Sequence, residues 1–230
     1  MNKKIFRSSI VLGSALFMFI MAPAAMAGYI GNPLATVDAG EMALGLSYDM
    51  VSRDYDIDIV GVGVEEGEQN RIIAKGTYGI SDELNIYAML GQVDDDDLGE
   101  AGLAYGIGGK YDLEIADMEC GLVFQVIKWS VDDGKVFAPK DTDADFTGID
   151  LALGTAREIS NDIVIYGGAM YSMESGELKM AAAKADIDAD DNIGVFIGAE
   201  YPAADQITIG AEYRAICESS ISLAVTYAFD

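Results

Sequence analysis

Beyond its first 27 residues, the chain is a succession of segments of about ten residues in which every second side chain is apolar. A β-strand sends successive side chains to opposite faces, so each segment is expected to form a strand with one apolar face. Weaker alternation at 57–64 and 178–184 is expected to extend neighbouring strands. The pattern predicts strands at 42–50, 71–80, 84–90, 102–111, 120–126, 149–154, 163–172, 193–201, 207–214 and 221–229.

The apolar faces of these segments carry no charged residue, although 23% of the chain is charged. In the first segment, one face holds Met42, Leu44, Leu46, Tyr48 and Met50, and the other face is small or polar. A Lys or Arg that faces the middle of a bilayer costs about 2–4 kcal/mol, so a lipid-facing surface excludes such residues. A soluble sandwich or lipocalin-like barrel instead hides its large side chains and exposes its charges. We therefore expect the uncharged faces to contact lipid.

The connections between the predicted strands alternate in length. Short links such as 81–83 and 202–206 alternate with the long segments 52–69, 130–146 and 174–191. Short turns at one end and long loops at the other are typical of outer-membrane barrels. Because an unpaired strand edge in hydrocarbon leaves backbone polar groups unsatisfied, the strands are expected to close. The prediction is an all-β, closed antiparallel transmembrane β-barrel of about ten strands, with eight or twelve as alternatives, short periplasmic turns and long acidic extracellular loops.

Aromatic residues on the apolar faces fall near the ends of the predicted strands. Such amphipathic rings favour the headgroup level of a membrane, and outer-membrane barrels carry one girdle of them at each interface. The predicted girdles are Tyr48, Tyr171 and Tyr213 at the outer ends, and Tyr78, Tyr111, Tyr201, Tyr227 and Phe229 at the inner ends.

The first 27 residues have the features of a secretory signal peptide. Three basic residues precede the uncharged apolar run 10–21, and Ala25-Met26-Ala27 has the small-x-small pattern of a cleavage site. The run is shorter than the ~18 apolar residues that a transmembrane helix needs, which disfavours a retained anchor. We expect cleavage near Ala27, a barrel domain over residues 28–230, and a location in the outer membrane of a Gram-negative bacterium.

Together these features resemble the class of small bacterial outer-membrane β-barrel proteins, which includes OmpA-type, omptin-type and porin-like barrels. The resemblance covers essentially all of residues 28–230. The segment from Ile221 to Phe229 resembles the C-terminal signal that such barrels present to the assembly machinery, although Asp230 follows the final aromatic residue. The resemblance implies outer-membrane lipid and the barrel assembly machinery as partners.

Charge and composition exclude several functions. The formal net charge of −25 at pH 7 is unsuited to nucleic acid, whose binding depends on Lys and Arg. The chain has no histidine, which removes Ser–His and Asp–His catalytic sites, so we expect no catalytic activity and no cofactor. Residues 106–110 resemble a phosphate loop only superficially, because position 104 is Ala and position 111 is Tyr. Cys120 and Cys217 fall at opposite ends of the predicted barrel, so no disulfide is expected between them.

Acidic residues gather in the longer connections, where they are candidates for weak binding of divalent cations. The runs 141–145 and 186–190 resemble the start of a calcium loop, but both lack the Gly at position six and the Glu at position twelve. The alternative is a solvated acidic loop. The candidate ligands are Asp94, Asp95, Asp96, Asp97, Asp141, Asp143, Asp145, Asp186, Asp188 and Asp190.

Charged and amide side chains on the faces opposite the apolar ones are expected to point into the lumen. These residues are Arg71, Lys75, Lys110, Gln125, Asp150, Glu200, Glu212 and Arg214. The lumen of so small a barrel is largely filled by side chains, which favours a paired network over a narrow polar conduit. We expect a structural or porin-like outer-membrane protein. The alternatives are a surface adhesin or receptor acting through the acidic loops, and a soluble periplasmic β-barrel ligand binder.

Overall fold

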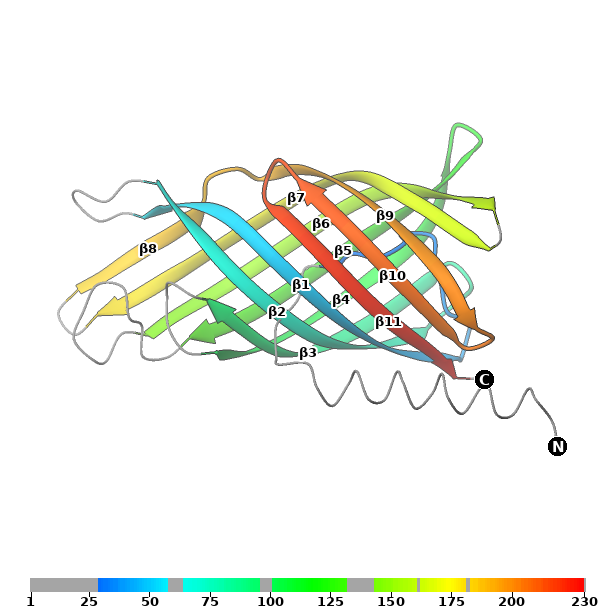
Figure 1. Cartoon of the computed structure of the whole chain (residues 1–230), viewed down its shortest axis with the longest axis horizontal. Helices are drawn as coiled ribbons and strands as arrows, with labels where there is room; N and C mark the ends of the chain where they lie inside the picture. Colours follow the sequence, from blue (N-terminus) through cyan, green and yellow to red (C-terminus); the bar gives the residue numbers. More distant parts are fainter. Residues whose placement is uncertain are drawn as a thin grey trace.

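A computed structural model describes residues 29–57, 64–95, 101–131, 143–160, 162–180 and 183–229, which form a closed β-barrel (Figure 1). The predicted signal peptide and Asp230 lie outside these residues. No helix in this part of the chain is long and apolar enough to cross a membrane. The strands are β1 (Met42–Ile57), β2 (Val64–Gly79), β3 (Leu84–Asp95), β4 (Gly102–Ile115), β5 (Met118–Val131), β6 (Asp143–Ser160), β7 (Ile163–Met180), β8 (Ala183–Ala189), β9 (Ile193–Ala204), β10 (Ile207–Ala215) and β11 (Ser219–Phe229).

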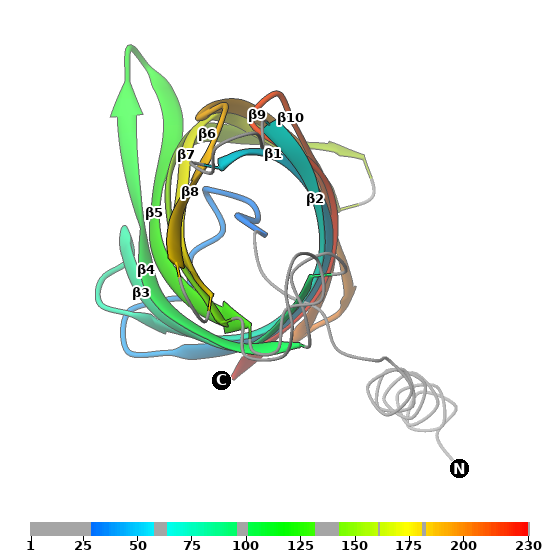
Figure 2. The same cartoon turned by 90° about the vertical axis from the view of Figure 1, so that its left-hand side faces the viewer.

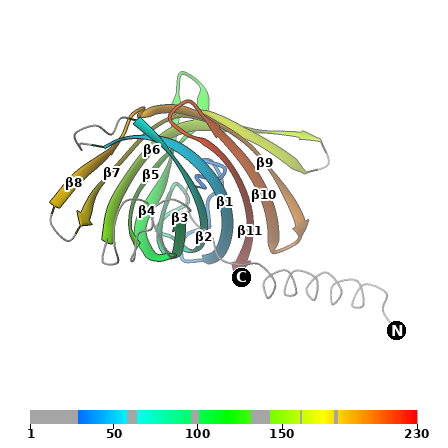
Figure 3. The same ribbon diagram turned by 60° about the vertical axis from the view of Figure 1, so that its left-hand side comes forward.

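Ten strands form the ring that the sequence predicts. The strands from β1 to β7 pair antiparallel in chain order. β7 then pairs with β9, β9 with β10, and β10 with β11. The ring closes because β1 pairs with β11, from Met42↔Phe229 to Ser52↔Ser219. The predicted closed antiparallel barrel is therefore confirmed. Its strands run obliquely along the long axis of the molecule, as Figures 1 and 3 show.

Large apolar side chains cover the outside of the ring. Ile107 and Ile197 point outward and are 66% and 58% exposed, whereas residues next to them in sequence turn inward. On β11, exposed and buried residues alternate strictly from Ser219 to Ala224. This distribution is the reverse of a soluble protein and matches the predicted lipid-facing surface.

The structure adds an eleventh strand, β8, at the end of the barrel with the long connections. β8 pairs with the outer half of β7 and with the last residues of β1, between Tyr55↔Ala189 and Ile57↔Ile187 (Figures 1 and 3). β9 pairs instead with the membrane half of β7. The chain therefore bends between β8 and β9, and the outer end of the barrel closes through β1, β8 and β7 without β9, β10 or β11. This extracellular extension is a correction to the predicted loop 174–191.

The described parts of the predicted loops 52–69 and 130–146, residues 52–57, 64–69, 130–131 and 143–146, are also strand. β6 and β7 have 18 residues each, whereas a transmembrane strand needs about 9–11, so these strands continue beyond the bilayer. The outward face of β1 changes from Met50 to the exposed Asp54, and that of β2 changes from Ile72 to the exposed Glu68. The acidic residues thus lie mainly on strands of the extension. They escaped the sequence prediction because both faces of these segments are polar.

Residues 29–37, which precede β1, lie inside the ring, and residues 38–41 are exposed beside the end of β2. Figure 2 looks into the outer end of the barrel and shows the segment 29–37, in blue, within the lumen. Ile30 is fully buried there. No periodic pattern in the sequence predicted this placement.

Candidate functional site

Buried ion pairs line one side of the lumen. The Arg214 guanidinium lies 2.8 Å from Glu218 Oε1, and its Nε lies 3.6 Å from Glu212 Oε1. Arg53 Nη1, on the neighbouring strand β1, lies 3.6 Å from Glu218 Oε2. These side chains are at most 2% exposed. Removing one partner of such a buried pair leaves the other charge unpaired, so the cluster stabilises the contact of β1 with β10 and with the turn between β10 and β11.

A second polar cluster lies further toward the outer end. Arg71 Nη2 is 3.2 Å from Glu174 Oε2, and Arg71 Nε donates to Gln69 Oε1 at 2.8 Å. Gln69 also donates to the Tyr55 hydroxyl at 2.8 Å, and that hydroxyl donates to Glu174. The lumen at this level is a connected polar network between β1, β2 and β7.

Large apolar side chains also point into the lumen. Trp129 and Phe146 stack with their ring centroids 3.9 Å apart. The sequence predicted mainly small or polar inner faces, and the structure adds a cluster of large inward side chains to them. Its buried members include Ile73, Tyr87, Met89, Val93, Val123, Ile127, Met170, Ile187 and Phe196. Polar clusters and apolar side chains thus share the interior.

The structure brings the predicted lumen residues into three groups. Arg71, Glu212 and Arg214 belong to the ionic clusters, and Lys75, Lys110 and Glu200 hold the N-terminal segment. Gln125 donates to Asp150 Oδ2 at 2.7 Å between β5 and β6. The sequence reasoning missed the lumenal residues Asp49, Arg53, Tyr55, Gln69, Glu174 and Glu218. On β1 the inward positions are odd-numbered and continue past Val51. The same alternation could therefore have identified Arg53 and Tyr55 as lumenal.

Residues 29–37, called here the N-terminal plug, are clamped at two places. The Glu212 carboxylate accepts the backbone N–H of Ile30 at 3.1 Å and that of Gly31 at 2.9 Å. Near the periplasmic end, Asn85 Oδ1 accepts the N–H of Val37 at 2.7 Å, and Asn85 Nδ2 donates to the Val37 carbonyl at 3.0 Å. A side-chain amide thereby pairs with the plug as a backbone would.

Charged side chains of the wall satisfy the remaining polar groups of the plug. Lys75 Nζ donates to the Tyr29 carbonyl at 3.0 Å, and Lys110 Nζ donates to the Asn32 carbonyl at 2.6 Å. The Tyr29 hydroxyl donates to Glu200 Oε1 at 3.1 Å. The predicted lumenal charges therefore serve in part to bind a segment of the same chain.

Glycines in the wall leave room for the plug. A Cβ on Gly121 would lie 2.2 Å from the carbonyl oxygen of Pro33, and one on Gly210 would lie 2.2 Å from the Tyr29 hydroxyl. At Gly121 the close atom belongs to the plug backbone, so the plug can approach β5 this closely only because the wall residue is glycine, whereas at Gly210 a shift of the Tyr29 side chain could relieve the contact.

A cavity of about 190 Å³ remains between the plug and the opposite wall. Its wall side is formed by small residues of β1 and β11, among them Gly45 and Ala224. Further along the same strand pair, Asp49 and Ser222 are fully buried. The cavity is thus a pocket beside the plug, and a layer of buried side chains lies beyond it.

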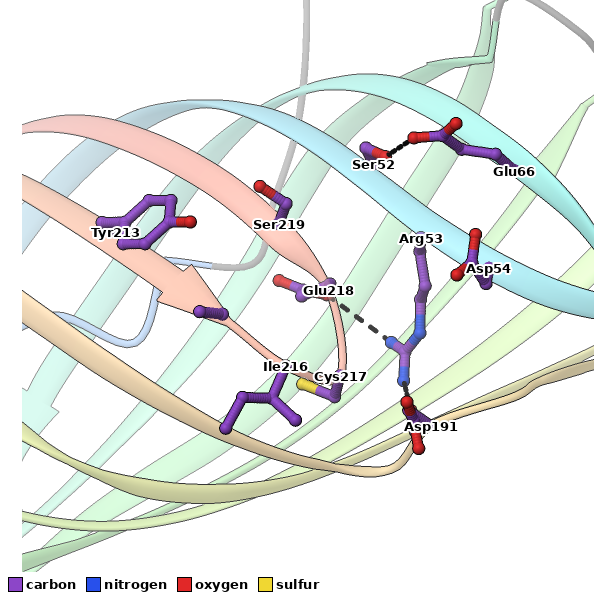
Figure 4. A pocket seen from close by; sticks show the side chains of 11 residues that line it. Ser52, Arg53, Asp54, Glu66, Asp191, Tyr213, Ile216, Cys217, Glu218 and Ser219 are labelled. Atoms are coloured by element: carbon purple, nitrogen blue, oxygen red, sulfur yellow. Dashed lines mark hydrogen bonds and ion pairs between the residues drawn. The ribbon is translucent and has the colours of Figure 1, made fainter.

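A second pocket, called here the wall pocket, opens through the barrel wall at the base of the extension (Figure 4). Its volume is about 250 Å³. The bend between β8 and β9 contributes Asp191, and the turn between β10 and β11 contributes residues 216–218. Figure 4 shows Arg53 extending between Glu218 and Asp191. The full lining is Ser52, Arg53, Asp54, Glu66, Asp191, Tyr213, Ala215, Ile216, Cys217, Glu218 and Ser219.

The turn between β10 and β11 carries a thiol and a carboxylate with shifted acidities. Burial would raise the pKa of Glu218, but the guanidinium groups of Arg214, Arg71 and Arg53 outweigh burial and hold that pKa below its usual value. Burial, together with the Glu218 charge, raises the pKa of Cys217 to about 11, so the thiol stays protonated. Cys120 lies near the inner end of β5 and Cys217 in the turn at the outer end of β10, and both are free and buried.

The candidate metal ligands do not converge in the described part of the chain. Asp186 and Asp188 lie on the exposed face of β8, and Asp190 follows in the bend. A strand places alternate side chains about 6.6–6.8 Å apart, so these carboxylates cannot enclose one ion as a calcium loop does.

The other candidate ligands are dispersed as well. Asp145 on β6 pairs with Lys179, and Asp95 is buried at the end of β3 beside the half-buried Asp94. Asp143 begins β6, and Asp96, Asp97 and Asp141 lie outside the described residues. In the described ranges no three acidic, His or Cys side chains are placed to hold a metal ion.

The predicted girdle residues lie near the ends of the apolar parts of their strands. Tyr48 and Tyr171 are in the middle of β1 and β7, because these strands continue past the apolar part. At the inner end, Tyr78 and Phe229 both pair with Met42, and Tyr111 pairs with Leu84. The remaining five are Tyr201 and Tyr227 at the inner end and Tyr48, Tyr171 and Tyr213 at the outer end.

Several solved structures are similar to this chain. The protease OmpT of Escherichia coli matches with 11% identity over 85% of this chain and 99% of its own, at a TM-score of 0.50. OprG of Pseudomonas aeruginosa matches with 12% identity over 86% of this chain and 99% of its own, at a TM-score of 0.45. The attachment invasion locus protein Ail of Yersinia pestis matches with 12% identity over 83% and 99%, at a TM-score of 0.39. At such identities the likeness concerns the fold alone.

No curated protein matches the sequence. The model of the outer membrane protein beta-barrel domain family, in contrast, matches residues 83–229, which is more than half of the chain. Together with the closed ring of outward-apolar strands, this match shows that the chain belongs to the outer membrane protein β-barrel family.

Proposed function

We propose that this protein is a structural outer-membrane barrel with a closed, non-conducting lumen. The filling of the lumen along its length carries the proposal. The N-terminal plug and a cavity of about 190 Å³ beside it occupy the periplasmic part, and the Arg214 and Arg71 clusters and the stacked Trp129 and Phe146 extend into the lumen beyond them. In this proposal the exposed acidic extension is the surface through which the protein meets other molecules.

The lumenal chemistry also supports a function without catalysis. The chain has no histidine to act as a general base. The carboxylates of Glu174, Glu212 and Glu218 are engaged by arginines, which suits them to hold the wall together rather than to transfer protons.

Planar-bilayer conductance tests the closed lumen. The purified chain beginning at residue 28 is expected to insert, as shown by heat-modifiable gel mobility, and to give no discrete conductance steps. Regular single-channel steps from correctly folded protein would contradict the proposal, because they require a continuous aqueous path.

A gated conduit is the second candidate function, and the plug favours it. The plug is held by hydrogen bonds to side chains rather than by strand pairing, and a cavity of about 190 Å³ already lies beside it. Deletion of residues 29–37 separates the two functions. Conductance by the deletion variant, with silence of the full chain, would favour the gated conduit, whereas silence of both folded proteins favours the structural barrel.

A further inference from the structure

The cavity beside the N-terminal plug lies over a position of the wall that has no side chain. Four residues of its lining stand directly opposite one another on β2, β1, β11 and β10, namely Lys75, Gly45, Thr226 and Thr208. Gly45 leaves a gap between the lysine on one side and the two threonines on the other. The strand register therefore places an ammonium group and two hydroxyl groups around one space of about 190 Å³.

In the described part of the chain, the two lysines of the lining are hydrogen-bonded only to carbonyl groups of the plug. Lys75 Nζ donates to the Tyr29 carbonyl at 3.0 Å, and Lys110 Nζ donates to the Asn32 carbonyl at 2.6 Å. Neither ammonium group lies within ion-pair distance of a carboxylate of the described residues. Because an ammonium group has three N–H donors, and because a half-buried charge without a counterion is costly, both lysines are suited to an anionic acceptor.

One carboxylate, that of Glu200, also belongs to the lining. Its Oε1 accepts the Tyr29 hydroxyl at 3.1 Å and the Asn32 N–H at 3.4 Å, so it is engaged by the plug. The lining thus carries two positive charges and one negative charge. A ligand with a single negative charge balances them.

Hydroxyl and apolar groups complete the lining. Within the described ranges, the hydroxyls of Thr208 and Thr226 have no hydrogen-bond partner, so both can donate into the cavity. Small apolar side chains cover much of the remaining wall, among them Ala43 and Ala224. A few convergent polar groups on an apolar lining are typical of a site for a small organic ligand.

The cavity opens toward the periplasmic end of the barrel. Its lining reaches Ala228, which pairs with Ala43 one position before the end of the β1–β11 ladder. Ala228 shares the inward face of β11 with the buried Ser222 and Ala224, yet it is exposed. Ala35, on the plug side of the lining, is also exposed. A small solute can therefore enter from the periplasmic side.

We propose that this cavity binds a short-chain monocarboxylate, an organic anion with one carboxylate group and a short apolar chain. The carboxylate accepts hydrogen bonds from Lys75 Nζ and from the hydroxyls of Thr208 and Thr226. The apolar chain lies against Ala43 and Ala224. This inference goes beyond the proposed structural role, and it does not depend on whether the lumen conducts, because the ligand enters and leaves by the same opening.

Size and charge distinguish this ligand from others. A cavity of about 190 Å³ exceeds the ~30 Å³ that one water molecule occupies in the liquid and is below the ~300–1,000 Å³ of pockets for drug-sized ligands. A dicarboxylate would bring a second negative charge toward Glu200, and an amine would face two ammonium groups. Inorganic phosphate would leave the apolar part of the lining without a contact.

A ligand-observed NMR titration of the full chain, solubilised in an uncharged detergent, tests the proposal. The probes are butyrate, succinate, butylamine and inorganic phosphate. We expect butyrate to bind saturably and the other three probes to bind at least about tenfold more weakly, because each lacks a feature that the lining recognises. Equal binding of succinate would overturn the single charge, equal binding of phosphate the apolar chain, and equal binding of butylamine the role of the lysines. Absence of butyrate binding to the folded protein would overturn the proposal as a whole.

Two glycine variants test whether butyrate binds in this cavity. Gly45→Val fills the gap beside Thr226, whose Oγ1 would lie 3.3 Å from the new Cβ, and should weaken butyrate binding at least about tenfold. Gly76→Val is the matched control, since it adds the same side chain to the exposed outer face of the neighbouring strand, where nothing lies within 4 Å of the Cβ. Binding should be unchanged in the control, and equal losses in both folded variants would contradict the assignment to the cavity.

The polar contacts are tested by Lys75→Met and by the double variant Thr208→Val with Thr226→Val. Each should weaken butyrate binding at least about tenfold, because each removes donors to the carboxylate. Since Lys75 also donates to the Tyr29 carbonyl, heat-modifiable mobility must first show that Lys75→Met folds. If Lys75→Met or Gly45→Val does not fold, the threonine variant decides the outcome, because valine keeps the shape of threonine. Unchanged butyrate binding in the folded threonine variant would overturn the proposal.

Discussion

The N-terminal plug should lose its docking when Glu212 is replaced by Ala. The Glu212 carboxylate accepts two backbone hydrogen bonds, from Ile30 at 3.1 Å and Gly31 at 2.9 Å. A hydrogen bond to a charged group contributes about 1.5–3 kcal/mol, so the two together contribute about 3–6 kcal/mol to docking. About 1.4 kcal/mol corresponds to a factor of ten in an equilibrium constant. The loss of both hydrogen bonds should therefore raise the equilibrium constant for opening of the plug at least about 100-fold.

Hydrogen–deuterium exchange of the folded protein in detergent measures this opening directly. In Glu212→Ala, the amides of the N-terminal plug should exchange at least about 100-fold faster than in the unmodified chain. Glu218→Gln is the matched control, since it perturbs a buried carboxylate that pairs with Arg214 and Arg53 rather than with the plug. Exchange of the plug should be nearly unchanged in the control.

Two results would refute this reasoning. If the plug of Glu212→Ala kept its protection while the variant was correctly folded, the two hydrogen bonds would not hold it. If Glu218→Gln accelerated exchange of the plug as strongly, the effect would come from general loosening of the barrel rather than from loss of the clamp.

Three further substitutions test other parts of the structure. Gly121→Ala should displace the N-terminal plug, since its Cβ would lie 2.2 Å from the Pro33 carbonyl oxygen, whereas Gly76→Ala has nothing within 4 Å and should leave exchange of the plug unchanged. Arg214→Met should lower the free energy of unfolding by about 3–5 kcal/mol in a urea titration, because it leaves buried carboxylates without their cation; a loss below about 1 kcal/mol would contradict this role. Ile216→Gly should raise the same free energy by about 1 kcal/mol by relieving the positive φ, and a decrease would argue against strain at this turn.

The membrane ring could be predicted closely from the sequence because two independent constraints act on the same residues. Alternation with a period of two marks a strand, and exclusion of charge from one face marks contact with lipid. Both constraints hold from Met42 to Met50 and again from Ile221 to Phe229, and these two segments pair to close the ring. The extracellular extension escaped because only one constraint remains there. From Arg53 to Asp56 polar residues occupy both faces, so a strand and a solvated loop have the same composition.

The lumen was predictable in part. The alternation along the strands predicts that Arg71, Glu212 and Arg214 point inward, and the structure brings Arg214 and Glu212 together. The partners Arg53 and Glu218 were missed because they lie in segments without an apolar face. The alternation along a strand thus predicts that a charged side chain points inward, but it does not predict with which side chain it forms an ion pair.

The sequence by itself determined which faces of the strands meet lipid, where the ring begins and ends, and the absence of a histidine-based site, since each of these depends on residue type and local spacing. Only the tertiary structure decided what fills and interrupts the barrel. The plug residue Ile30 binds Glu212 through its backbone N–H across 182 positions of sequence, and a backbone group leaves no signature in the order of side chains. The wall pocket likewise lies where the chain bends between β8, which pairs with β1, and β9, which pairs with β10. This change of partner is a property of the closed ring rather than of any single segment.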